Sequence, residues 1–90
     1  MKKKKTARNF LSDALRLPED VVKGESLLTF IGRSAVRIEN YRGILFYTDT
    51  NIRIQAKAYR LSVSGSRLSI RYYDKDEMEI TGKIETITFE

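Results

Sequence analysis

Residues 51–70, NIRIQAKAYRLSVSGSRLSI, carry apolar side chains at every second position in three successive runs. A period of two is the pattern of a β-strand with one buried face, because successive side chains of a strand point to opposite faces. Short polar segments separate the runs, and Gly65 stands in one of them. The stretch therefore predicts three short strands joined by tight turns, with the apolar pairs Ile52 and Ile54, Leu61 and Val63, and Leu68 and Ile70.

The same alternation continues on both sides of this stretch. Polar residues such as Arg37, Arg53 and Glu79 alternate with the apolar ones and are expected on the opposite face of the sheet. Segments rich in Gly, Ser, Asn and Asp lie between the runs, and these residues supply the backbone conformations that tight turns need. The further apolar pairs are Leu28 and Phe30, Val36 and Ile38, Ile44 and Phe46, Met78 and Ile80, and Ile87 and Phe89.

The spacing of these runs also restricts how the strands are connected. No helical segment separates them, so parallel crossovers, which need a dozen or more connecting residues, are excluded. A sheet that is apolar on one side must bury that side. We therefore predict a mostly β fold, a seven- or eight-strand antiparallel meander that is curled or folded into a small sandwich. The near-regular spacing leaves a compact β-solenoid as the alternative.

Residues 1–8 form a basic arm. Four lysines follow one another with nothing apolar to bury, so we expect the arm to be flexible. Such a charge run either keeps a protein in solution or attracts an anionic lipid surface or the phosphates of nucleic acid. The candidate contacts to an anionic surface or phosphate are Lys2, Lys3, Lys4, Lys5 and Arg8.

Residues 9–25 predict a short amphipathic helix followed by a turn. Phe10, Leu11 and Leu15 recur at helical spacing, and Pro18 disfavours helix at the residue before it. A helix of about two turns does not persist alone. We therefore expect its apolar stripe to dock on the sheet, on a membrane or on a partner, and we place the β-domain in residues 26–90.

The composition excludes most catalytic chemistry. The 90 residues contain neither histidine nor cysteine, so the commonest general base, the thiol nucleophile and the commonest metal ligands are missing. The acidic cluster of Asp74, Asp76 and Glu77 lacks the ligand count and glycine of an EF-hand loop. Gly82-Lys83 lacks the glycine-rich stretch that precedes the lysine of a phosphate-binding loop. We predict no enzymatic activity, no cofactor, no metal site and no small-molecule substrate.

The net charge of +5 is concentrated at the N-terminus. Residues 1–16 carry six basic groups and one acidic group, whereas residues 17–90 carry eleven of each. No apolar stretch approaches the roughly 20 residues that span a bilayer, and no signal-peptide hydrophobic region follows the lysines. We expect a cytoplasmic chain, and nucleic-acid binding enters only as an alternative function of the arm.

The segment Ile38-Glu39-Asn40-Tyr41-Arg42-Gly43-Ile44 has turn residues between two apolar runs. Asn and Gly both tolerate left-handed backbone, so we predict a strand, a turn and a returning strand with Tyr41 and Arg42 at the tip. Exposed aromatic and arginine side chains are frequent at binding hot spots. Tyr41 and Arg42 are therefore candidate partner-binding residues, together with Phe10, Leu11 and Leu15.

A set of motifs extends over nearly the whole chain from about Phe10: Leu17-Pro18-Glu19-Asp20-Val21, Gly32, Val36, Ile38 to Ile44, Leu61, Val63, Gly65, Leu68, Ile70, Asp76 to Ile84, Ile87 and Phe89. No single motif in this set is a chemical signature. Their order and spacing resemble the YabP/YqfC family of sporulation proteins, and the leucine-proline opening is more similar to the YqfC branch.

The resemblance implies a role in endospore formation, in the mother-cell compartment, beside a membrane-protein partner and without enzymatic activity or a cofactor. We therefore predict a non-enzymatic interaction module, cytoplasmic in the mother cell and peripheral at its membrane. Exposed sheet edges also pair readily with other chains, so self-assembly into a homo-oligomer is a variant of this prediction. The alternative is a nucleic-acid-binding regulator that uses the basic arm.

Overall fold

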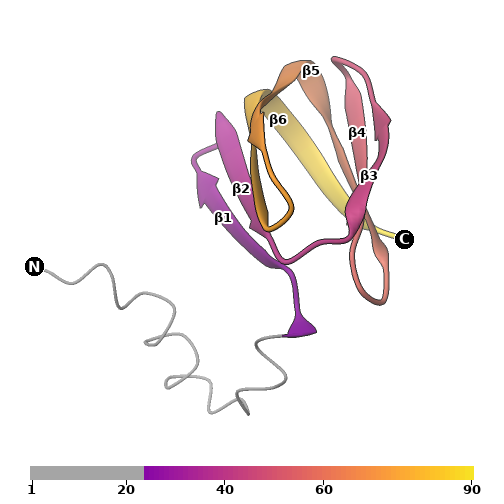
Figure 1. Cartoon of the computed structure of the whole chain (residues 1–90). Coiled ribbons are helices and arrows are strands. Elements are labelled where there is room, and N and C mark those ends of the chain that lie inside the picture. Colours follow the sequence, from indigo (N-terminus) through magenta and orange to yellow (C-terminus); the bar gives the residue numbers. More distant parts are fainter. Residues whose placement is uncertain (1–23) are drawn as a thin grey trace, which may run out of the picture.

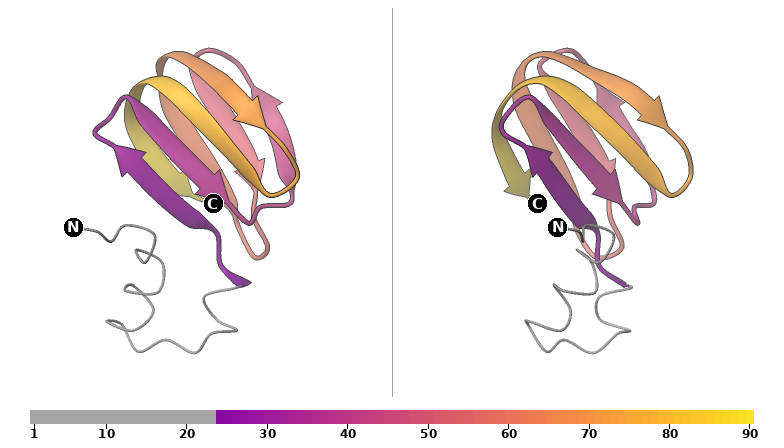
Figure 2. Two further views of the ribbon diagram at one scale, coloured as in Figure 1. Left: turned by 60° about the vertical axis from the view of Figure 1, so that its left-hand side comes forward. Right: turned by 90° about the vertical axis from the view of Figure 1, so that its left-hand side faces the viewer.

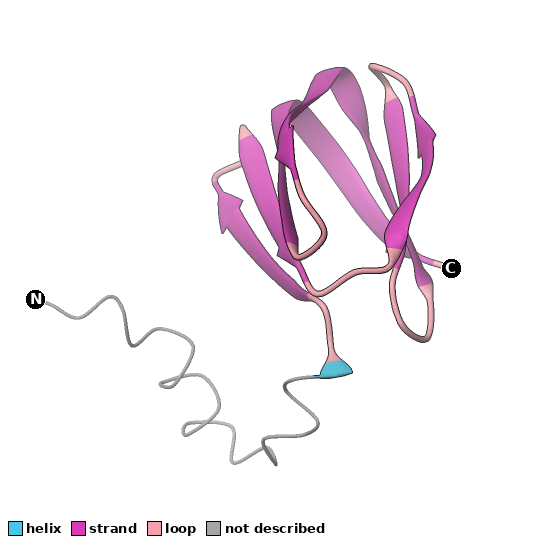
Figure 3. Cartoon of the chain, in the orientation of Figure 1, coloured by secondary structure: helices cyan, strands magenta, loops and turns pink. Residues whose placement is uncertain are grey.

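The computed structural model describes residues 24–90, which form one open antiparallel sheet of six strands (Figure 1). The strand order in space is β1-β2-β6-β5-β4-β3, so β1 and β3 lie at the two ends. All named elements of residues 24–90 are strands, and the only helical piece in this part of the chain is the short one at Gly24, before β1 (Figure 3). The strands are β1 (Leu27–Ile31), β2 (Ala35–Glu39), β3 (Gly43–Tyr47), β4 (Asn51–Gln55), β5 (Arg60–Tyr73) and β6 (Glu77–Phe89).

The antiparallel, all-β prediction is confirmed, but the number and arrangement of the strands differ from it. Each of the two long strands, β5 and β6, takes up two of the predicted short strands, which reduces the count to six. The sheet is open and single, so the predicted curled or folded sandwich is wrong. The order is not a simple meander either, because β2 pairs with β6. Antiparallel pairing throughout also excludes the β-solenoid.

Two glycines explain why predicted turns became continuous strand. A β-carbon on Gly65 would lie 1.9 Å from the carbonyl oxygen of Lys83, and one on Gly82 would lie 2.5 Å from that of Arg67. Gly82 has a φ of 134°, in the region that favours glycine. Here β5 and β6 approach each other too closely for any side chain, so each glycine permits a close backbone approach inside a strand. We call this place the β5–β6 crossing.

The two short hairpins attach to the sheet at the β5–β6 crossing. In the β1–β2 turn, the carbonyl of Ser34 accepts from Gly82 N–H at 3.1 Å, and that of Arg33 accepts from Ile84 N–H at 2.8 Å. In the β3–β4 turn, the carbonyl of Thr50 accepts from Gly65 N–H at 3.1 Å. The register shifts between β5 and β6 leave the N–H groups of Gly65, Gly82 and Ile84 without a partner on the other long strand. The hydrogen bonds to the turns satisfy these groups.

Each of the two long strands pairs with a different short strand at its start. The start of β5, up to Ser64, pairs with β4, whereas the start of β6, up to Thr81, pairs with β2. Figure 2 shows both long strands curving between these neighbours. Their curvature lets apolar side chains from both hairpins meet in one core: Val36, Ile38, Tyr41, Ile52, Ile54, Leu61, Val63, Leu68, Met78, Ile80 and Ile84.

The predicted hairpin with Tyr41 and Arg42 at its tip is wrong. β2 and β3 do not pair, and they are separated in the sheet by β6, β5 and β4. The connection between them crosses from one side of the sheet to the other (Figure 1). Asn40 does adopt the expected left-handed backbone, with a φ of 65°, but it starts this crossing rather than a tight turn. The basic arm and the predicted helix with Phe10, Leu11 and Leu15 lie outside the described residues.

We expect Gly65→Ala to destabilise the protein by about 3 kcal/mol or more, because the new methyl group would overlap the backbone of β6. Gly43→Ala is the matched control, since nothing lies within 4 Å of its added β-carbon. Urea unfolding measures both changes. A Gly65→Ala protein as stable as the Gly43→Ala protein would contradict the close approach at the β5–β6 crossing.

Candidate functional site

Tyr41, a predicted partner-binding residue, lies in the core with 7% of its surface exposed. Its hydroxyl donates a hydrogen bond to the carbonyl oxygen of Asp74, and its ring stacks on Tyr73 with a centroid distance of 6.0 Å. Burial, followed by the charges near the ring, raises the pKa of Tyr41 to about 12. Through this hydrogen bond and ring contact, Tyr41 links the β2–β3 connection to the β5–β6 turn. Arg42 is exposed and is the surface residue of the predicted pair.

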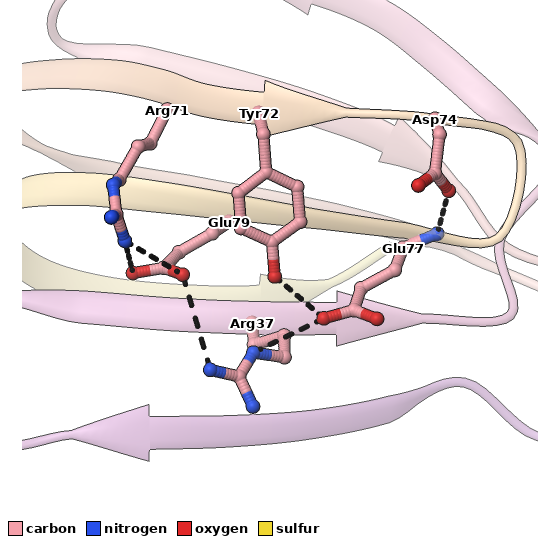
Figure 4. A network of polar contacts seen from close by, with 6 residues as sticks. All are labelled: Arg37, Arg71, Tyr72, Asp74, Glu77 and Glu79. Atoms are coloured by element: carbon pink, nitrogen blue, oxygen red, sulfur yellow. Dashed lines mark hydrogen bonds and ion pairs between the residues drawn. The ribbon is translucent and has the colours of Figure 1, made fainter.

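A network of polar side chains covers the solvent face of β2, β6 and β5 (Figure 4). Arg37 Nε lies 3.2 Å from Glu77 Oε2, and Arg71 Nη1 lies 3.4 Å from Glu79 Oε2. Arg37 Nη2 lies 4.0 Å from Glu79 Oε1, and the hydroxyl of Tyr72 donates to Glu77 Oε2 at 2.5 Å. This bond to Glu77 raises the pKa of Tyr72. The network confirms that the polar residues of these strands share one face.

A β-bulge assembles the network. The register steps from Ile70 opposite Ile80 to Tyr72 opposite Glu79, so Arg71 is the extra residue of the bulge. Arg71 and Tyr72 are neighbours in the chain, yet both reach glutamates of β6. The shift also returns Tyr73 to the core side, where it stacks on Tyr41. Sequence alternation alone would have placed Tyr72 and Arg71 on opposite faces.

The charges of this network neutralise one another. Glu79 is buried, and it lies between two arginines, so its carboxylate is held as a paired acceptor. The N–H of Arg37 Nε is not aligned for a hydrogen bond, so its pairing with Glu77 is mainly electrostatic. A paired network of this kind stabilises a sheet face.

The two ends of the sheet differ from this charged face. The end strands, LLTFI of β1 and GILFY of β3, contain no charged residue. Their outer side has no strand partner among residues 24–90. Five large apolar side chains on these two strands are about half exposed, between 49% and 55%: Phe30, Ile31, Leu45, Phe46 and Tyr47.

Uncharged edges are unusual, because charged side chains normally protect a sheet from pairing with other chains. The parts of β5 and β6 that extend past β4 and β2 follow that rule. They carry Arg67 and Arg71 on β5, and Lys83 and Glu85 on β6. The protection of β3 is limited to one bulge, between Ile44 and Phe46. Of the free strand flanks in residues 24–90, those of β1 and β3 are therefore the most receptive to another strand.

Cross-strand contacts hold the side chains of β3 in place. Phe46 lies opposite Arg53, whose guanidinium carbon is 5.9 Å from the ring centroid. Tyr47 lies opposite Ile52, and its hydroxyl accepts a hydrogen bond from Ile70 N–H at 3.0 Å. The strand is thus ordered while half of each aromatic surface stays exposed, which favours binding because little side-chain entropy remains to be lost.

Sequence reasoning missed the β3 edge. It paired Ile44 with Phe46 as alternating core residues and did not single out Leu45 or Tyr47. The available signal was the unbroken apolar run of residues 44–47, ILFY, which departs from the period of two. Such a run predicts a strand exposed or buried on both faces, and only the strand order shows that this one lies at an end.

Residues 24–90 lack two features that mark other classes of protein. No helix within residues 24–90 is long and apolar enough to cross a membrane. The same residues hold no group of three or more acidic side chains placed to bind a metal ion.

Comparison with known proteins shows the family of this chain. The family model of YabP matches residues 22–90. The chain belongs to the YabP family. This is a family of sporulation proteins. The region matched by the YabP family contains all six strands, so both uncharged edges lie within it.

A curated relative extends the similarity towards the N-terminus. The protein of Bacillus subtilis (strain 168) described as "Uncharacterized protein YqfC" is 28% identical over 87 residues. The match covers 97% of this chain and 94% of that protein, so the two have nearly the same length. No solved structure matches the chain.

The raised pKa of Tyr41 predicts a loss of stability in alkaline solution. Between pH 10 and about pH 12 the unfolded chain releases the phenolic proton while the folded chain retains it, so the free energy of unfolding falls as pH rises. We expect a loss of about 2 kcal/mol from this group. Tyr41→Phe should remove this loss and cost about 1 kcal/mol at neutral pH, where it deletes the hydrogen bond to Asp74.

Urea unfolding at several pH values tests this prediction, with Tyr73→Phe as the matched control on the neighbouring, half-exposed ring. The slope of stability against pH should become shallower for Tyr41→Phe and change less for Tyr73→Phe. Equal slopes in the parent protein and the Tyr41→Phe protein would contradict the burial of the Tyr41 hydroxyl.

Proposed function

We propose that this YabP-family chain is a non-enzymatic interaction module of endospore formation. It acts in the mother cell and takes up an extended segment of a membrane-protein partner along β3. The observation that carries the proposal is the uncharged end strand β3, with three consecutive half-exposed apolar side chains, Leu45, Phe46 and Tyr47.

Strand addition explains how such an edge binds. The unpaired backbone groups of an end strand hydrogen-bond an incoming extended segment, and this supplies affinity that is independent of side chains. Alternate side chains then supply specificity. On β3 these would be Ile44 and Tyr47 on the core side and Phe46 on the solvent side. The edge therefore fits a partner segment that is itself apolar and uncharged.

The charge distribution supports a position at a membrane surface. Six of the seven charged groups in residues 1–16 are basic. Each lysine or arginine near an anionic leaflet contributes about 1 kcal/mol to binding. In this proposal Lys2 to Lys5 and Arg8 hold the chain at the cytoplasmic face of the membrane, and Phe10, Leu11 and Leu15 add apolar contacts to lipid or to the partner.

The lack of candidate catalytic groups supports a binding role. The chain has no histidine or cysteine, and the buried carboxylate of Glu79 is paired with Arg37 and Arg71. A hydrolytic or transfer reaction would need a free general base or nucleophile. We therefore assign no substrate and no cofactor to this module.

Co-purification from sporulating cells tests the proposal. Tagged full-length protein would be compared with a chain lacking residues 1–16, with Phe46→Glu and with Ala58→Glu. Phe46→Glu introduces a negative charge on the edge. The new carboxylate would lie opposite Arg53, and this pairing of opposite charges favours retention of the fold. Ala58→Glu adds the same charge in the exposed segment between β4 and β5. Circular dichroism and thermal unfolding would establish that each variant folds.

We expect the full-length and Ala58→Glu proteins to recover the same membrane protein. Phe46→Glu should recover roughly tenfold less, which corresponds to ~1.4 kcal/mol of binding free energy. The truncated chain should shift from the membrane fraction to the soluble fraction. Equal recovery by Phe46→Glu would exclude β3 as the binding site. Recovery of nucleic acid alone, lost at high salt, would support the nucleic-acid-binding regulator instead.

A further inference from the structure

The two uncharged end strands run in opposite directions. Every pair in the order β1-β2-β6-β5-β4-β3 is antiparallel, so direction reverses at each of the five steps across the six strands. After an odd number of reversals, β3 runs opposite to β1. An even-stranded antiparallel sheet always has this property, and its two ends are therefore compatible with each other.

We propose that β3 of one chain pairs with β1 of a second copy, which joins the chains head to tail. A copy in the same orientation presents β1 antiparallel to β3 without being turned over. The new pair of strands would be antiparallel, like every pair of neighbouring strands within the sheet. This inference rests on the proposed function, since a second copy would occupy the same β3 edge, and the chain at one end of each open assembly keeps a free β3 for the partner segment.

The side chains of the two edges match on both faces. On the core side, Phe30 of β1 faces Val36, and Tyr47 of β3 faces Ile52. Both rings are half exposed because the core ends beneath the outermost strands. Head-to-tail pairing would place the aromatic side chains of the two edges on one continuous apolar face, where each covers surface that the isolated chain leaves in water.

On the solvent side the exposed apolar residues of the two edges also come together. Ile31 of β1 lies at 55% exposure, and Leu45 of β3 at 51%. Neither strand would bring a charge into the contact. Residues 17–90 are neutral overall, with eleven basic and eleven acidic groups, so two copies of this part of the chain do not repel each other strongly.

The same observations favour head-to-tail pairing over a two-fold dimer. A dimer through β3 alone would leave the equally uncharged β1 unpaired in both copies, and a dimer through β1 would leave both β3 strands unpaired. A head-to-tail contact uses both edges at once, and each has five residues. Contacts of this heterologous kind continue into rings or filaments. Assembly would therefore proceed beyond two chains.

Sedimentation velocity of the full-length chain, with matched variants on each edge, tests this proposal. Ile31→Lys blocks β1, Leu45→Lys blocks β3, and Ala58→Lys places the same charge in the exposed segment between β4 and β5. A second pair, Thr29→Glu and Phe46→Glu, blocks the same strands with side chains that face Arg37 and Arg53. This second pair keeps the test decisive if a lysine variant does not fold.

We expect the parent chain and Ala58→Lys to form species larger than a dimer as concentration rises. Ile31→Lys and Leu45→Lys should each associate roughly tenfold more weakly and remain monomeric. An equal mixture of the two should form a species of two chains, because each contributes one intact edge.

Three results would overturn the proposal: a parent chain that stays monomeric, dimers of Ile31→Lys alone, or a mixture that stays monomeric. Dimers of Ile31→Lys would show β3 pairing with β3. Failure of self-assembly is distinguishable from failure of the proposed function. Ile31→Lys should still recover the membrane protein through its intact β3, whereas Phe46→Glu should recover roughly tenfold less.

Discussion

The close approach of β5 and β6 at Gly65 and Gly82 is the constraint on which the rest of the structure depends. A side chain at either position would collide with the opposite backbone. Because both residues are glycines, the two longest strands can stay paired through a change of register. The released N–H groups then bind the turns of the two hairpins, at Ser34 and Thr50. One contact therefore fixes the long ribbon and both hairpins, and it determines where the core forms.

This arrangement also determines where the sheet ends. The β1–β2 hairpin attaches beside β6 and the β3–β4 hairpin beside β5, which leaves β1 and β3 outermost. The network around Glu79 and Arg71 protects the middle of the solvent face with paired charges, whereas the end strands have none. The fold of this YabP-family chain therefore leaves two uncharged edges without a further strand among residues 24–90. The proposals of partner binding and head-to-tail assembly both follow from that distribution.

The sequence predicted the strands well and their arrangement poorly, for physical reasons. Alternation over residues such as Ile52 and Ile54 reports local burial, and it located nearly every strand. Glycine signals either a turn or a close backbone approach, so Gly65 was misread. The pairing of β2 with β6 depends on contacts between distant segments, and no local pattern encodes it. For the same reason Tyr41 was predicted at an exposed tip and instead lies in the core, while the edge position of Leu45 was missed.

The most direct test of these conclusions is amide hydrogen exchange of the full-length chain at low and at high protein concentration. Amides near the β5–β6 crossing should be strongly protected at both concentrations, since they exchange only when the whole sheet opens. Amides of β1 and β3 should exchange rapidly at low concentration and become protected together at high concentration. Protection of both end strands at low concentration, or equal exchange of these strands at the two concentrations, would contradict the two free edges and their pairing.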